Sequence, residues 1–98
     1  MVMNKGKVID TVDRALTMAT DHVSGNRDPT LPDCMDSQVH RFLETLKEMK
    51  SSLETPDAAW VSQKYMGMAI ADGWPFESEL GKLICEAEDA YHSLKASV

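Results

Sequence analysis

The chain has 98 residues and carries 16 Asp and Glu against 10 Lys and Arg, giving a net charge of −6 at pH 7. This length suits one domain, so we expect residues 1–98 to fold as a single unit. The acidic balance argues against nucleic-acid binding, which needs a dense basic surface to neutralise phosphates.

Membrane association is also not expected, because no run of about 18 apolar residues occurs. The two cysteines, Cys34 and Cys85, are far apart in the sequence and show no paired spacing. Reduced thiols of this kind are typical of a reducing compartment, so we predict a cytoplasmic protein.

The first predicted helix covers residues 5–24. Its apolar residues recur on one side at helical spacing: Val8, Val12, Ala15, Leu16, Ala19 and Val23. Gly25 and Asn26 follow directly, and both residue types adopt the left-handed conformation that ends helices.

The second predicted helix covers residues 31–53. Thr30 and Asp33 have the spacing of a capping box, which indicates a helix start. The apolar residues then alternate in steps of four and three, the spacing of a seam between aligned helices: Met35, Val39, Phe42, Leu46, Met49 and Leu53.

Two more helices are predicted over residues 56–72 and 75–95. Thr55 followed by Pro56 is a strong start signal, because proline at the first helical position loses no hydrogen bond. The connections between successive helices are short, which makes sequential helices antiparallel neighbours. The predicted fold is therefore all-α, a single-domain antiparallel four-helix bundle.

The predicted helix over residues 56–72 is apolar on two sides, and only one side can face the core. The other side forms a surface that we call the Trp60 stripe: Trp60, Gln63, Lys64, Gly67, Ala71 and, in phase with them, Trp74. Gly67 and Ala71 would let another backbone approach closely. Either residues 1–3 or the loop over residues 26–31 covers this stripe, or it is a binding site for another protein or a second copy of the chain.

Two side-chain arrangements could carry chemistry. Cys85, Glu88, Asp89 and His92 share what we expect to be the outer side of the last helix, but a structural zinc site needs further ligands from elsewhere. His40 has the exposed mid-helix position that a phosphotransfer histidine needs, although its neighbours are bulky or acidic.

We therefore expect a non-enzymatic protein-interaction module without a cofactor or bound metal. The Trp60 stripe is its candidate partner-binding site, and the acidic charge favours a basic partner protein. Inhibitors and immunity-type proteins are examples of small acidic bundles with this role, an analogy of fold and charge alone. Phosphotransfer through His40 and metal binding through Cys85 and His92 remain the alternatives.

Overall fold

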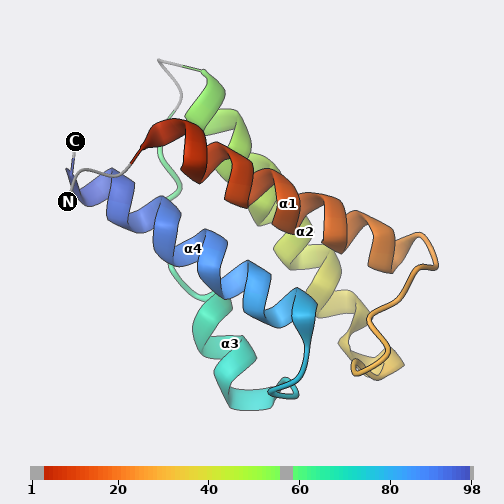
Figure 1. The fold of residues 1–98 in the computed structure, drawn as a ribbon. Helices are drawn as coiled ribbons and strands as arrows, with labels where there is room; N and C mark the ends of the chain where they lie inside the picture. The colour runs from red at the N-terminus through yellow and green to blue at the C-terminus, as the bar shows by residue number, and fades with distance from the viewer. Residues whose placement is uncertain (1–3, 56–58, 98) are drawn as a thin grey trace.

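Three long helices form the framework of the fold in the computed structural model: α1 (Lys5–Val23), α2 (Asp36–Glu54) and α4 (Glu79–Ser97) (Figure 1). The structure describes residues 4–55 and 59–97. Helix α1 packs against both α2 and α4 and runs antiparallel to each of them.

Two shorter elements complete the chain. Helix α3 (Met66–Gly73) packs against α4, and a 3-10 turn, η1 (Asp33–Met35), leads into α2. The protein is therefore an all-α antiparallel bundle, as predicted, and no strand occurs in the part of the chain that the structure describes.

The prediction for the first helix is confirmed almost to the residue. Val8, Val12, Ala15 and Ala19 on α1 are buried, as their spacing requires. After the helix, Gly25 has a φ of +116°, a left-handed conformation that glycine adopts without steric cost.

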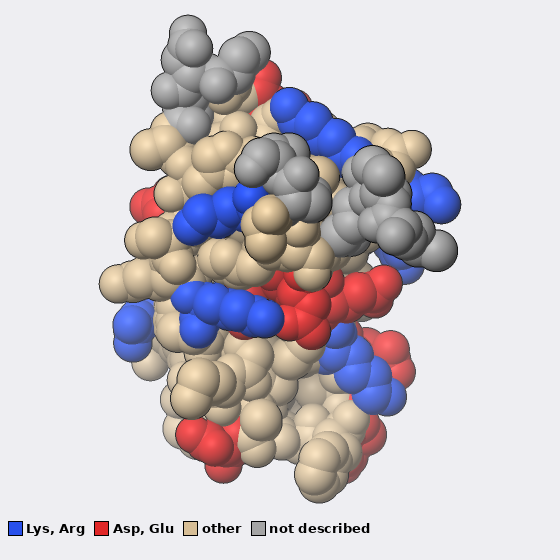
Figure 2. All heavy atoms as spheres, turned by 90° about the vertical axis from the view of Figure 1, so that its left-hand side faces the viewer, with Lys and Arg blue, Asp and Glu red and all other residues tan. Residues whose placement is uncertain are grey.

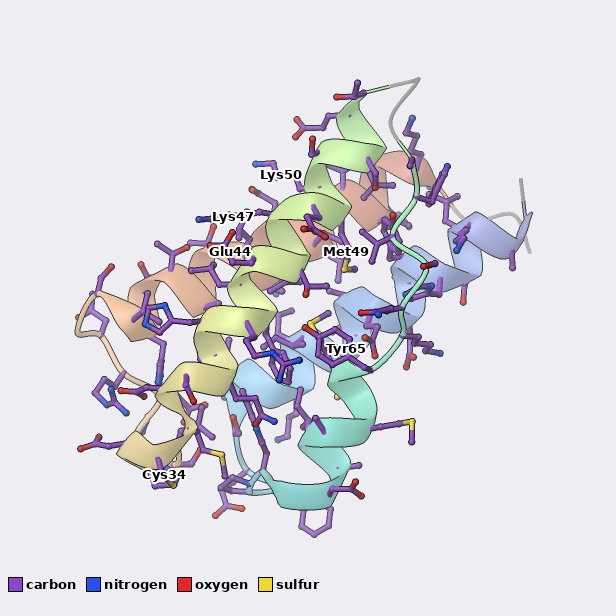
Figure 3. The ribbon with its side chains drawn as sticks, turned by 180° about the vertical axis from the view of Figure 1, so that it is seen from behind. Cys34, Glu44, Lys47, Met49, Lys50 and Tyr65 are labelled. Atoms are coloured by element: carbon purple, nitrogen blue, oxygen red, sulfur yellow. The ribbon has the colours of Figure 1, made fainter. Side chains whose placement is uncertain are left out.

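The predicted buried side of the second helix is also confirmed. Its apolar residues from residue 39 onward are all buried: Val39, Phe42, Leu46, Met49 and Leu53. These side chains lie in the core between α1, α2 and α4, and Met49 can be seen pointing inward from α2 in Figure 3.

The predicted capping box at the start of the second helix is wrong. The Thr30 hydroxyl donates to the Asp28 carboxylate at 2.6 Å instead of capping the helix, and Asp33 pairs with Arg27 at 3.1 Å. The Asp28 carboxylate and the Arg27 guanidinium thus bind the two side chains that would have formed the capping box, because hydrogen bonds to charged groups are stronger. The chain enters α2 through η1, with no side-chain cap on either element.

The predicted helix over residues 56–72 is wrong for the described residues before Met66. Residues 59–65 are not helical, and α3 begins only at Met66. The Val61 N–H donates to the Tyr91 hydroxyl at 2.8 Å and the Tyr65 N–H to the Glu88 carboxylate at 3.1 Å. Side chains of α4 therefore take backbone groups that a helix would have used internally. The start signal at Pro56 lies outside the described residues.

Helix α4 begins at Glu79, four residues later than predicted. The Ser78 hydroxyl accepts the Gly81 N–H at 3.0 Å, and the Asp28 carboxylate accepts the Ser78 hydroxyl at 2.7 Å and the Leu80 N–H at 3.2 Å. The loop after α1 is thereby tied to the start of α4, because Asp28 supplies an acceptor for a free N–H of the first turn.

Candidate protein-binding surface

The Trp60 stripe is not a continuous surface, because residues 59–65 are not helical. Trp60 is half-buried against Tyr91, with ring centroids 5.1 Å apart. Trp74 is buried and stacks on Phe42 at 5.6 Å, and its indole N–H donates to the Gln38 side chain. The two tryptophans therefore belong to different parts of the structure.

The other members of the stripe also separate. Gln63 is exposed on the nonhelical segment, beside Trp60. Lys64 forms an ion pair with Asp89 of α4 at 3.1 Å. Lys64, Gly67 and Ala71 line the boundary between α3 and α4, and Trp74 lines its continuation, so four of the six predicted residues come together on one surface.

That surface contains two adjoining hollows between α3 and α4, which we call the α3–α4 groove. The first, of about 380 Å³, is lined by Ile70, Ala71, Trp74, Pro75, Phe76, Ser78, Gly81, Lys82 and Cys85. The second, of about 460 Å³, is lined by Lys64, Gly67, Met68, Ala71, Cys85, Glu88 and Asp89. Because Ala71 and Cys85 line both hollows, the groove is continuous.

Two large apolar side chains on this groove are left in solvent. Phe76 is 93% exposed and Met68 is 72% exposed. On the face shown in Figure 2, the lower part, at the level of α3, consists mainly of uncharged residues, and charged residues gather in a band above it. Exposed apolar groups that adjoin a hollow are a feature of protein-binding surfaces.

The position of α3 beside the groove is set by Glu88, which is 1% exposed. Its carboxylate accepts hydrogen bonds from the backbone N–H groups of Tyr65, Met66 and Gly67 at 3.1, 2.9 and 2.8 Å. These are the free donors at the start of α3, where a negative charge is also favoured by the helix dipole. Gly67 permits this approach, because a Cβ there would lie 3.1 Å from the carboxylate.

The prediction that Glu88 lies on the outer side of α4, together with Cys85, Asp89 and His92, is therefore wrong. The signal was present in the sequence: Glu88 is four residues after Ile84 and three before Tyr91, both buried, so it shares their side of the helix. A charge at such a position needs a buried partner, and the α3 backbone provides it.

The other residues of this predicted group, Cys85, Asp89 and His92, do not form a set of metal ligands. Cys85 is half-buried, and burial raises the pKa of its thiol. Burial lowers the pKa of His92, whose Nε2 has no hydrogen-bond partner in the described structure. Among residues 4–55 and 59–97, no group of three or more His, Cys, Asp or Glu could hold a metal ion.

His40 is exposed on α2, as predicted, and another hollow lies further along the same helix. That hollow, of about 490 Å³, lies between α2 and the nonhelical segment before α3 and includes Trp60. Two of its hydroxyl groups are already engaged, because Thr45 bonds to Tyr65 at 2.8 Å and Ser52 bonds to Tyr91 at 2.7 Å. Figure 3 shows the Tyr65 side chain lying between its own segment and α2.

A polar cluster at the connection from α1 to α2 was not foreseen from the sequence. The buried His22 accepts the Asp28 N–H on Nδ1 at 2.9 Å, and its Nε2 lies 3.3 Å from the Asp36 carboxylate. Arg27 binds both oxygens of Asp36, at 2.9 and 2.8 Å. The Arg27 hydrogen bonds, helped by His22, lower the pKa of Asp36 to about 2.

Comparison of the chain with protein-family models, curated proteins and solved structures found no match. No helix within the described ranges is both long and apolar enough to cross a membrane. The described residues form a small helical bundle with a partly exposed apolar surface beside α3.

Proposed function

We propose that this protein is a non-catalytic interaction module that binds another protein through the α3–α4 groove. The observation that carries the proposal is the exposure of Phe76 and Met68 beside the two hollows. Burying a side chain of this size contributes about 1.5–3 kcal/mol, so the two residues together could anchor a partner.

The architecture around the groove supports a rigid binding site. Glu88 fixes the start of α3, and Gly81 allows Trp74 to pack closely on α4, because a Cβ at Gly81 would lie 3.1 Å from the indole. A surface held in this way loses little conformational entropy on binding. A module of this kind acts by occupying its partner, as inhibitors and immunity-type proteins do.

We propose further that the protein is cytoplasmic. This is supported by the free thiols of Cys34 and Cys85, which are typical of a reducing compartment. We prefer binding over the two alternatives, phosphotransfer and metal coordination. Each alternative depends on isolated side chains, His40 or the pair Cys85 and His92, whereas the groove combines two hollows with two exposed anchors.

The test is a selection of displayed peptides on the immobilised full chain, followed by affinity measurement on three variants. Phe76→Asp and Met68→Asp place a charge on the groove without touching the core, and Met18→Asp is the matched control, because Met18 is 36% exposed on α1. We expect the selected peptides to lose at least about tenfold in affinity for both groove variants and to retain affinity for the control. Selected peptides that bind all four proteins equally would overturn the proposal.

A further inference from the structure

The charges around the α3–α4 groove are unbalanced. Residues 59–98 carry six side-chain carboxylates and three lysines. Each lysine is engaged: Lys64 pairs with Asp89 at 3.1 Å, Lys82 lies 3.7 Å from Glu79, and Lys95 donates to the Val61 carbonyl at 3.4 Å. Negative charge is therefore left over on this part of the molecule.

Three of the carboxylates without a partner lie close in sequence to residues that line the groove. Asp72, Glu77 and Glu86 are exposed, and none of them forms an ion pair within the described structure. Each directly follows a residue of the groove in the sequence, since Asp72 follows Ala71, Glu77 follows Phe76, and Glu86 follows Cys85. An apolar groove bordered by unpaired carboxylates is complementary to a ligand with apolar and cationic groups.

The spacing along α3 indicates what fits. Gly67 lines one hollow and Ala71 lines both, and four residues of helix span about 6 Å. Side chains at positions i and i+4 of an incoming helix have a similar separation. The absence of bulky side chains at Gly67 and Ala71 allows the backbone of such a helix to approach.

From this geometry, and resting on the proposed function, we infer that the α3–α4 groove takes a cationic amphipathic helical segment of the partner. Two apolar side chains one turn apart fill the two hollows, and flanking Lys or Arg residues face Asp72, Glu77 and Glu86. A second copy of this chain is a poor occupant, because its net charge is −6 and its groove would present the same three carboxylates.

The test uses two synthetic helical peptides of the same length, each with two leucines at i and i+4. One carries lysines at all flanking positions, and its twin carries glutamates there. Binding of each labelled peptide to the full chain is measured by fluorescence anisotropy at low and high salt. We expect the lysine peptide to bind at least about 100-fold more tightly than its twin at low salt, with this advantage shrinking as salt rises.

Two variants of the groove then separate the apolar contribution from the charge. Ala71→Trp fills the position shared by both hollows, and we expect it to abolish binding of the lysine peptide. The triple variant Asp72→Asn, Glu77→Gln, Glu86→Gln keeps the shape, and we expect it to weaken binding by about tenfold and to reduce the salt dependence.

A matched triple variant on α1 and α2 controls for the effect of the protein's net charge on binding. Asp10→Asn, Asp21→Asn and Glu48→Gln remove the same charge from exposed positions of α1 and α2, and we expect less than about a threefold effect. Equal weakening by the two triple variants, or equal binding of the two peptides, would overturn the inference. If Ala71→Trp still abolished binding in that case, the proposed function would stand without it.

Self-association is measured by sedimentation of the wild type and Ala71→Trp. We expect both to be monomeric. A wild-type dimer that Ala71→Trp dissociates would identify a second copy as the occupant and overturn the inference of a cationic segment.

Discussion

The Glu88 carboxylate on α4 accepts the Met66 backbone N–H at 2.9 Å, and this contact marks the residue at which α3 begins. Met66 lies at the buried end of α3, where water cannot satisfy the free N–H groups. A carboxylate from the neighbouring helix satisfies them instead, and thereby fixes the position of the groove that α3 and α4 form.

Substitution of Glu88 by Gln should therefore destabilise the protein. The amide keeps the shape but loses the charge, and its NH2 group cannot accept the N–H donors that one carboxylate oxygen now accepts. We expect the free energy of unfolding to fall by about 2–3 kcal/mol in denaturant titrations. Asp89→Asn is the control, because Asp89 is 70% exposed and should matter little. Equal loss in the two variants would contradict the capping role of Glu88.

The sequence predicts the buried sides of α1 and α2 well because their apolar residues lie on one side at regular spacing, although α2 begins at Asp36 and not at residue 31. Val12 and Phe42 are buried as that spacing requires. In the third segment the pattern was compatible with a helix from residue 56, and the structure departs from it through hydrogen bonds to Tyr91 and Glu88, which are 30 and 23 residues away from Val61 and Tyr65. Local propensity does not report contacts at such separation.

The candidate site was foreseen only in part for the same reason. Gly67 and Ala71 were selected as small residues on an exposed side, and both line the groove. Phe76 falls within the predicted helix over residues 75–95, yet it lies outside α4, which begins only at Glu79, and it is 93% exposed. Because this helix boundary was predicted wrongly, the predicted site did not include Phe76, the most exposed large apolar side chain in the described part of the chain.

Tyr91→Phe should loosen the nonhelical segment before α3 without unfolding the bundle. The Tyr91 hydroxyl bonds to Ser52 at 2.7 Å and accepts the Val61 N–H at 2.8 Å, so its removal leaves a backbone donor without a partner. We expect a loss of about 1–2 kcal/mol in unfolding free energy and faster amide hydrogen exchange across residues 59–65.

Ser52→Ala separates the two hydrogen bonds of the Tyr91 hydroxyl. It removes the partner on α2 and leaves the bond to the Val61 N–H in place. We expect Ser52→Ala to leave hydrogen exchange at Val61 nearly unchanged. Equal acceleration of exchange at Val61 in both variants would show that the Tyr91 contact with Val61 is not what holds the segment.

Phe42→Ala should be among the most damaging substitutions on α2. Phe42 is 1% exposed and lies between the rings of Tyr65 and Trp74, at 5.7 and 5.6 Å. Removal of this ring leaves a cavity at the junction of α2 with α3, and we expect a loss of about 3–5 kcal/mol in thermal or denaturant unfolding. His40→Ala, two residues away but exposed, should have almost no effect. Similar melting of the two variants would contradict the assigned orientation of α2.

The loop cluster makes stability depend on pH at the acid end. Because Arg27 and His22 lower the pKa of Asp36 from its ordinary 3.8 to about 2, the folded protein holds this carboxylate ionised where the unfolded chain protonates it. The stabilisation is therefore fully present above pH 3.8 and is lost as pH falls towards 2. We expect Asp36→Asn to lower the melting temperature at neutral pH and to reduce the further loss between pH 4 and 2, since the titrating group is gone.

Asp33→Asn is the matched control for the acid range. Asp33 also contacts Arg27, at 3.1 Å, but its side chain is 95% exposed, so solvent screens the interaction. The melting curve of this variant should keep the wild-type slope between pH 4 and 2, whereas Asp36→Asn should flatten it. Arg27→Gln should flatten it as well, because the hydrogen bonds from Arg27 are the main cause of the lowered pKa of Asp36. Parallel acid profiles for the wild type, Asp36→Asn and Arg27→Gln would show that this cluster does not set the acid stability of the bundle.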